Sequence, residues 1–434
     1  MKNKSFQITR KHLFALSGIL ATLFLILVIY HTKNYPASSS SAHEQPDERS
    51  FADTLNVTYS NEGIVDFGDP NFKKLVKKLS QLGSGKERSV VNIIQFGDSH
   101  TASETITATM RTLLQQQFGN AGIGWITPMN VPVSGQRHSL ISFQSQDWQL
   151  VNSLTVQNAD FAMGGYIATP IQAGATITVT PRQTSSERWI ARFTIKSSAR
   201  SPLIITDANG QRTNLNPANT SNWQEIEAEV TLPITISATE AYSTQLGGIW
   251  LAKKNASGVT VSPIGTSGMQ QTNWRTWTDQ WPVQLTQTRA DLIIISYGTN
   301  EAFNSKLDIH DMENALRLSI KIIRKSLPES TIVIVGAPDS MRRDKSAEAG
   351  CTQRQPAMLH AVKQTQRKVA QQEKTLFWDW QQAMGGDCAI LNWQQNGLAT
   401  KDLVHLNNQG YQRSGTLFYN DLMELARIGS AHSP

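Results

Sequence analysis

Two apolar, β-branched runs that each end at a glycine most strongly limit the fold of this chain. The first covers residues 90–96 and ends at Gly97, and the second covers residues 290–297 and ends at Gly298. Near-continuous apolar runs of this length are typical of parallel strands that are buried on both faces. A helix-forming stretch follows the first run, from about 103 to 117. Alternating strands and helices predict an α/β fold with helices on both faces of a parallel sheet.

The turn after the first run carries a candidate nucleophile. The segment Gly97-Asp98-Ser99-His100 places Ser99 at the carboxyl end of a strand, where open α/β sheets bind their ligands. The helix that follows directs its positive end and free N–H groups toward this turn. Gly-Asp-Ser is also common in turns with a helix cap, and that alternative is favoured when the motif is considered alone.

A candidate general base lies near the carboxyl terminus. Asp402 and His405 are three residues apart, so both side chains can lie on one side of a turn. Asp402 can then accept from the imidazole Nδ1–H and leave Nε2 free to take a serine proton. An N-cap followed by a surface histidine fits the same spacing. Asp98 competes with Asp402 for the orienting role, but its place beside the serine favours bracing of that turn.

A candidate oxyanion donor follows the second apolar run. Asn300 lies on the loop after Gly298, where its carboxamide can donate to a carbonyl oxygen that becomes negative in the transition state. Gly-x-Asn is also an ordinary turn sequence. Nucleophile, base and oxyanion donor together are the set that acyl transfer requires.

These motifs, in this order, resemble the blocks of the SGNH (GDSL-type) hydrolases. The resemblance implies a three-layer, flavodoxin-like α/β domain in which Ser99, Asp402 and His405 form a catalytic triad. It also implies an oxyanion hole made by the N–H groups of Ser99 and Gly268 and by the Asn300 side chain.

The sequence around each block narrows the resemblance. It is similar to the branch that contains peptidoglycan O-acetylesterases and O-acetyltransferases, over about 85–130 and 262–428. Gly268 occupies the block position of the lone glycine, although Gly265 stands three residues earlier. The resemblance implies an O-acetylated glycan, peptidoglycan, as substrate and partner.

The middle of the chain has a different pattern. Between about 132 and 262, short alternating runs such as 175–180 and 189–194 are separated by Gly, Pro and Asn. This pattern predicts an all-β sandwich inserted into the catalytic domain, whose two parts are then 61–131 and 263–434. A similar insertion, like a carbohydrate-binding module, occurs in the branch named above. Five aromatic side chains of the insert could stack on sugars, but a place in the sandwich core is favoured. They are Trp148, Tyr166, Trp189, Trp223 and Trp250.

The amino terminus predicts export. Lysines and arginines precede an uncharged apolar run over 13–30. This run is longer than the roughly 7–15 residues of a secretory signal and reaches the length of a transmembrane helix. We therefore expect residues 1–31 to form an uncleaved anchor in the inner membrane, with a polar tether over 32–60 and the rest on the periplasmic face. A cleaved signal and a free periplasmic protein form the alternative.

The chain contains two cysteines, Cys351 and Cys388. In an exported chain we expect them to form one disulfide, the alternative being two buried thiols. A formal net charge of +6 suits anionic partners such as cell-wall glycan or membrane phospholipid. The sequence has no basic run interleaved with aromatic residues, so nucleic-acid binding is not predicted. No motif indicates a metal or cofactor.

Three functions follow. The first is an exported esterase that removes O-acetyl groups from peptidoglycan muramic acid through an acetyl-serine. The second is an O-acetyltransferase with the same residues, in which a glycan hydroxyl replaces water. The third is a glycan-binding protein whose catalytic domain is idle.

Overall fold

The structure is a computed structural model. It describes residues 63–86, 88–132, 135–184, 186–197, 203–343 and 350–431. The expected anchor at 1–31 and tether at 32–60 lie outside the described residues. Within the described ranges, no helix is both long and apolar enough to cross a bilayer.

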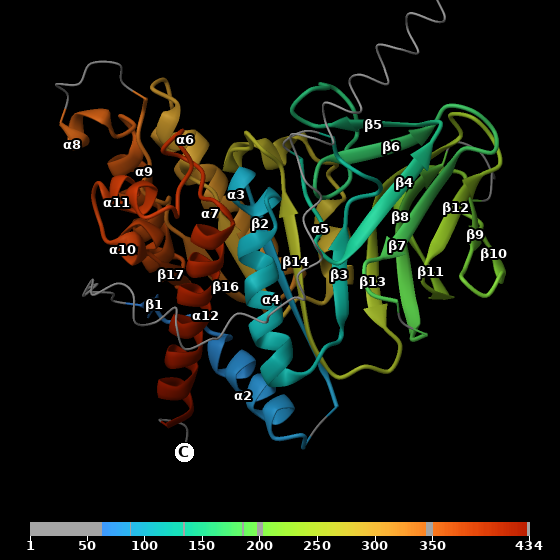
Figure 1. The fold of residues 1–434 in the computed structure, drawn as a ribbon, viewed down its shortest axis with the longest axis horizontal. Helices are drawn as coiled ribbons and strands as arrows, with labels where there is room; N and C mark the ends of the chain where they lie inside the picture. The colour runs from blue at the N-terminus through green and yellow to red at the C-terminus, as the bar shows by residue number, and fades with distance from the viewer. Residues whose placement is uncertain are drawn as a thin grey trace, which may run out of the picture. The chain divides into compact units, whose positions relative to one another are not determined.

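A six-stranded sheet forms the centre of the catalytic domain (Figure 1). Its strands, in spatial order, are β1 (Ile64–Asp66), β17 (Leu376–Trp378), β16 (Thr331–Val335), β15 (Leu292–Ser296), β2 (Val90–Gly97) and β14 (Gly258–Gly265). All neighbouring pairs are parallel except β1 with β17, so the predicted parallel sheet is confirmed with one antiparallel edge strand.

Helices cover both faces of this sheet. One layer contains α2 (Phe72–Gly83), α4 (Thr105–Phe118) and α12 (Asn408–Ala431), and the other contains α5 (Trp281–Thr288), α7 (Ile309–Ser326) and α9 (Leu359–Gln372). The shorter helices are α3 (Ser99–Ala102), the 3₁₀ helix η1 (Gln271–Thr276), α6 (Thr299–Phe303), α8 (Cys351–Arg354), α10 (Trp380–Met384) and α11 (Ala389–Gln395).

The central strand β2 shows why the chain forms three layers. Its apolar side chains alternate between the two faces: Val91 and Ile93 join the core under the first helical layer, and Ile94 and Phe96 join the core under the second. A strand that is apolar on both faces is stable only between two helical layers. The predicted three-layer α/β class is confirmed.

The strand register places the motifs at one edge of the sheet. Gly97 at the end of β2 pairs with Ser296 of β15 on one side and with Gly265 of β14 on the other. Because the three strands are parallel, the turns that follow them leave the same edge of the sheet. The serine turn therefore lies between the loop after Gly265 and the loop that begins at Gly298.

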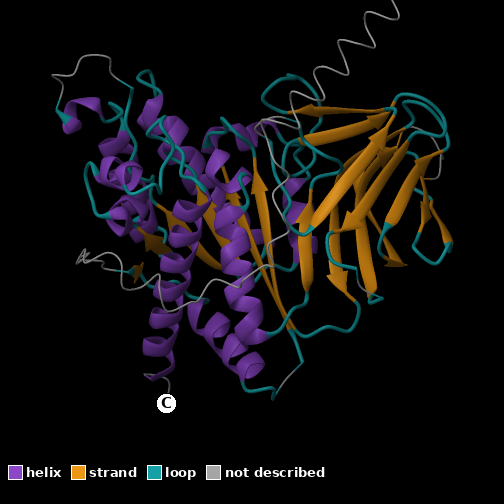
Figure 2. Cartoon of the chain, in the orientation of Figure 1, coloured by secondary structure: helices purple, strands orange, loops and turns teal. Residues whose placement is uncertain are grey.

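An antiparallel sandwich is inserted between β2 and β14. Figure 2 shows it as strands and loops, in contrast to the helix-rich catalytic domain. One sheet has the order β10 (Arg212–Leu215), β9 (Leu203–Thr206), β12 (Ile234–Ala238), β7 (Thr176–Pro181) and β4 (Ile141–Gln146). The other has the order β11 (Thr220–Thr231), β8 (Arg188–Ser197), β13 (Thr244–Lys253), β6 (Tyr166–Pro170) and β5 (Trp148–Asn152), with β3 (Gly122–Ile126) also paired to β13. The predicted all-β insert is confirmed.

The strand pairings move the limits of the insert away from 132 and 262. β3, expected in the first catalytic segment, pairs antiparallel with β13 of the sandwich. Conversely, β14 begins at Gly258 and pairs parallel with β2 of the catalytic sheet. The chain therefore changes sheets close to residues 122 and 257.

The five aromatic residues of the insert that could stack on sugars are core residues. Trp148, Tyr166, Trp189, Trp223 and Trp250 are all buried, with Tyr166 fully so. Three of them, Tyr166, Trp223 and Trp250, share a core cluster with Phe96 of the catalytic sheet. These three side chains join the insert to the catalytic domain. Because all five are buried, none of them offers an exposed stacking platform to a sugar.

Candidate active site

Ser99 is the first residue of α3, directly after the turn that ends β2. Only glycine fits at position 97, because a Cβ there would lie 2.1 Å from Thr101 Oγ1 and 2.6 Å from the Ser296 carbonyl oxygen. The Asp98 side chain caps α3 by accepting from the His100 N–H at 3.0 Å. The cap and the glycine together hold the serine at the tip of a tight strand-to-helix turn.

His405 lies between the serine and an acid. Its Nε2 is 2.9 Å from Ser99 Oγ, and its Nδ1 is 2.7 Å from Asp402 Oδ2. With Nδ1–H donating to the carboxylate, Nε2 is left as the acceptor of the serine proton. The structure thus brings together the three residues expected to form a triad, although Ser99 lies about 300 positions before the other two in the chain.

Asp402 is held as an anion. Burial raises its pKa, but hydrogen bonds from Thr400 Oγ1, from the His405 ring and from the N–H groups of Val404 and His405 outweigh this and lower the pKa below its ordinary value. Leu403 has a positive φ of 59°, which lets the turn fold back so that both N–H groups reach Asp402 Oδ1. The ionised carboxylate fixes the imidazole tautomer and stabilises the imidazolium that forms during proton transfer.

Among the described residues, the hydrogen-bonded acid of the His405 imidazole is Asp402 and not Asp98. The Asp98 side chain accepts from the His100 N–H and is fully buried, and burial raises its pKa to about 6. These contacts agree with the expected bracing role, and the orienting contact belongs to Asp402.

His100 packs behind His405. Its Nδ1 is 2.9 Å from the Tyr411 hydroxyl, and its ring lies 5.4 Å from the His405 ring and 5.2 Å from that of Trp380, measured between centroids. Burial and the nearby His405 lower the pKa of His100 to about 3. A neutral ring at this position supports the base by packing without adding a competing positive charge.

The structure separates the two candidate oxyanion glycines. The N–H of Gly265 donates to Gln136 Oε1 at 2.8 Å, and a Cβ at this position would lie 2.5 Å from the backbone nitrogen of Ala102. Gly265 therefore serves packing and strand termination. Gly268 is exposed, has a positive φ of 85°, and would place a Cβ only against Leu154, at 3.7 Å. Its accessible backbone suits the donor role that the resemblance implies, and that role remains a prediction.

Asn300 is joined to the loop of Gly268. Its Nδ2 donates to the Met269 carbonyl oxygen at 3.0 Å, and Gln270 Nε2 donates to the Asn300 carbonyl oxygen at 3.3 Å. One amide hydrogen of Asn300 is thereby engaged, and the other is available to a substrate oxygen. The carboxamide is oriented by the same loop that carries the second expected donor.

Sequence reasoning missed Glu301, which ties these two loops together. This carboxylate is fully buried and accepts from the Gln271 N–H at 2.7 Å and from the Gly298 N–H at 3.0 Å. Burial raises its pKa to about 7. Its signal was a glutamate three residues after Gly298, at the position where a capping box places its acid.

Cys351 and Cys388 form a disulfide, so the expected pairing is confirmed. The bond joins the start of α8 to the residue before α11. It closes a segment that contains α9 and β17 and precedes the Asp402–His405 turn.

The three-layer α/β fold and its site define a serine hydrolase of the SGNH (GDSL) class. The site combines a nucleophilic serine, an imidazole, an orienting carboxylate and an exposed glycine–asparagine loop. A family model described as "GDSL-like Lipase/Acylhydrolase family" matches residues 228–413, and one described as "Peptidoglycan O-acetylesterase, N-terminal" matches residues 121–235. A search of curated proteins finds no match.

A solved structure described as a peptidoglycan O-acetylesterase in action is 37% identical to this chain, covers 84% of this chain and 99% of its own, and has a TM-score of 0.75. The chain therefore belongs to the peptidoglycan O-acetylesterase family.

More distant structures are also similar. A putative GDSL-like lipase from Parabacteroides merdae is 20% identical over 38% of this chain and 73% of its own, with a TM-score of 0.32. A family two carbohydrate esterase from Cellvibrio japonicus is 10% identical over 66% of this chain and 99% of its own, with a TM-score of 0.27.

Proposed function

We propose that this chain hydrolyses the O-acetyl esters of peptidoglycan muramic acid through an acetyl-enzyme on Ser99. One observation carries the proposal: the unbroken hydrogen-bond chain from Ser99 through His405 to Asp402, in a chain of this family.

The first half-reaction transfers the acetyl group to the enzyme. His405 takes the hydroxyl proton of Ser99 while the serine oxygen attacks the acetyl carbonyl carbon. The negative oxygen that forms accepts hydrogen bonds from the N–H groups of Ser99 and Gly268 and from the side-chain amide of Asn300. When the intermediate collapses, the bond from the carbonyl carbon to the sugar oxygen breaks, and His405 gives its proton to that oxygen.

The second half-reaction restores the serine. A water molecule gives one proton to His405 and attacks the acetyl carbon, and the same donors hold the new oxyanion. The bond to Ser99 Oγ then breaks, the serine regains its proton from His405, and acetic acid leaves and loses its remaining proton to the solvent. In an acetyltransferase, a glycan hydroxyl would take the place of this water.

The test is acetate release from O-acetylated peptidoglycan by the chain after residue 45, compared with Ser99→Ala. Release by the wild type alone supports the esterase. Labelling of Ser99 by a fluorophosphonate without acetate release, together with acetyl transfer to an added glycan acceptor, would identify a transferase. Absence of both labelling and release would identify an idle glycan-binding protein.

We also propose that residues 1–31 anchor the protein to the inner membrane with the catalytic domain in the periplasm. The proposal is supported by the uncharged apolar run over 13–30 behind a basic flank. Full-length protein should stay in the membrane fraction after carbonate extraction, and a chain that begins after residue 45 should be released. Release of the full-length chain at a shortened mass would instead support a cleaved signal.

A further inference from the structure

A polar cleft of about 830 Å³ lies where the insert meets the catalytic domain. The catalytic domain supplies Ser103 from the end of α3 and Asn408 and Gln412 from the first turns of α12. The insert region supplies Arg137 and Arg182. A volume of this size is in the range of clefts that bind small molecules, which is roughly 300–1,000 Å³.

The cleft begins one helical turn from the nucleophile. The N–H of Ser103 donates to the Ser99 carbonyl oxygen at 3.0 Å, so the two residues are separated by about 5–6 Å along the helix axis. Asn408 stands three residues after His405 and begins α12. A substrate that places one group at the serine can therefore reach the cleft with a neighbouring sugar or substituent.

Two unpaired cations line this cleft. Arg137 and Arg182 are exposed, and neither guanidinium makes an ion pair with any residue that the structure describes. The acidic lining residue, Glu104, is already paired with Arg111 at 2.8 Å, and both of these side chains are buried. The cleft therefore presents uncompensated positive charge.

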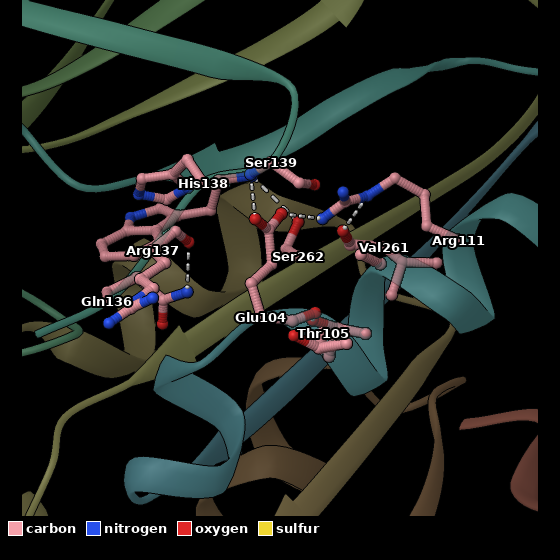
Figure 3. A network of polar contacts seen from close by, with 12 residues as sticks. Glu104, Thr105, Arg111, Gln136, Arg137, His138, Ser139, Val261 and Ser262 are labelled. Carbon is pink, nitrogen blue, oxygen red and sulfur yellow. Dashed lines mark hydrogen bonds and ion pairs between the residues drawn. The ribbon is translucent and has the colours of Figure 1, made fainter. Parts of the chain in front are cut away.

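The loop that carries Arg137 is held by three hydrogen bonds, and Figure 3 shows the one between Glu104 and Ser139. Glu104 accepts from the Ser139 N–H, and the backbone N–H of Arg137 donates to the Ala102 carbonyl oxygen at 2.8 Å. On the other side, Gln136 accepts from Gly265 at 2.8 Å. A loop backbone that is already fixed reduces the ordering cost when an anion binds at Arg137.

The second arginine is also anchored through its backbone, because the Arg182 N–H donates to the Leu140 carbonyl oxygen at 2.8 Å. The neighbouring His138 lines the cleft without adding charge: its Nε2 lies 2.9 Å from Thr127 Oγ1, and burial lowers its pKa to about 4. The two guanidinium groups are thus the charges that a ligand would meet.

We propose that Arg137 and Arg182 form an anion subsite that binds carboxylate groups of the glycan substrate and so favours peptidoglycan over neutral O-acetylated sugars. The proposal rests on the proposed function. Peptidoglycan carries carboxylates on its stem peptides, and removal of the peptide exposes the lactyl carboxylate of muramic acid. Guanidinium groups recognise carboxylates through paired, charge-assisted hydrogen bonds.

The experiment measures kcat/KM of the chain after residue 45 and of its Arg137→Gln/Arg182→Gln variant. Three substrates are compared: intact O-acetylated peptidoglycan, the same glycan after amidase removal of the stem peptides, and a chemically O-acetylated chitooligosaccharide without carboxylates. We expect the preference for intact peptidoglycan over the neutral oligosaccharide to fall about tenfold or more, mainly through KM. The salt dependence of KM should weaken in parallel.

Each outcome decides one point. An effect confined to intact peptidoglycan assigns the subsite to stem-peptide carboxylates, and an equal effect on the trimmed glycan shows that the subsite also binds the lactyl carboxylate. An unchanged preference ratio, or an equal loss on all three substrates, overturns the proposal. Arg212→Gln, at an exposed arginine of β10, is the matched control and should leave the ratio unchanged. If the wild type releases no acetate from any substrate, the proposed function itself fails.

Discussion

The buried ion pair between Glu104 and Arg111 should dominate the stability of the junction behind the serine turn. Both side chains are 3% exposed, and Arg111 also donates to the Val261 carbonyl oxygen at 3.0 Å. Arg111→Met keeps most of the apolar stem but leaves the carboxylate buried without its cation, which typically costs about 3–5 kcal/mol. The lost hydrogen bond adds about 1 kcal/mol. We therefore expect a loss of about 4–6 kcal/mol in the free energy of unfolding.

Urea unfolding followed by tryptophan fluorescence measures this loss as a lower midpoint at an unchanged slope. The double variant Glu104→Gln/Arg111→Met should be more stable than Arg111→Met alone, because it removes the unpaired buried charge while keeping an acceptor for Ser139. Lys74→Met, in a pair whose side chains are 57% and 77% exposed, is the control and should cost about 0–1 kcal/mol. A loss for Arg111→Met no larger than that of the control would show that the buried ion pair does not dominate the stability of this junction.

Three further predictions concern the triad, the serine turn and the disulfide. Asp402→Asn should lower kcat by about 10⁴-fold without unfolding the protein, because the imidazole of His405 loses the carboxylate that sets its tautomer; a loss below tenfold in acetate release would contradict this. Because the pKa of Asp98 is raised to about 6, its protonated form is favoured in the folded state. The stability that this protonated group contributes is complete below pH 4 and is lost as the pH rises through 6. Over this range the unfolding free energy of the wild type should fall by about 3 kcal/mol relative to that of Asp98→Asn. A difference between the two proteins that stays constant with pH in urea titrations would contradict this. Reduction of the bond between Cys351 and Cys388, which are 37 residues apart, should cost about 4 kcal/mol in the same assay, and an unchanged midpoint would exclude a stabilising role.

The sequence was most informative where local patterns and long-range packing agree. The buried strands β2 and β15 and the β-sandwich insert were expected near their observed positions. In each of these elements, the apolar residues that form the sequence pattern are also the residues that become buried.

The break between α3 and α4 shows where such patterns fail. A single helix from about 103 was expected, whereas Glu104 adopts a positive φ of 64° between α3 and α4. This conformation accompanies the burial of the Glu104 carboxylate against Arg111, seven residues ahead, and against Ser139 from the insert. A contact made by a distant segment leaves no periodic signal in the helix itself.

The limits of the insert and the role of Glu301 were hidden for similar reasons. The run of β3 has the composition of a strand for either sheet, and only its pairing with β13 decides between them. Glu301 was visible as a neighbour of Asn300, but its two backbone partners become apparent only once the loops meet.

Trapping the acyl-enzyme shows whether Ser99 is the residue that carries the acetyl group. Wild-type protein turning over O-acetylated peptidoglycan would be quenched in acid, digested and mapped by mass spectrometry, with Ser99→Ala treated in parallel. The account predicts an acetyl group on Ser99 of the wild type and no acetylation of the variant. Acetate release at full rate by Ser99→Ala, or an acetyl group on another residue of the active wild type, would contradict it.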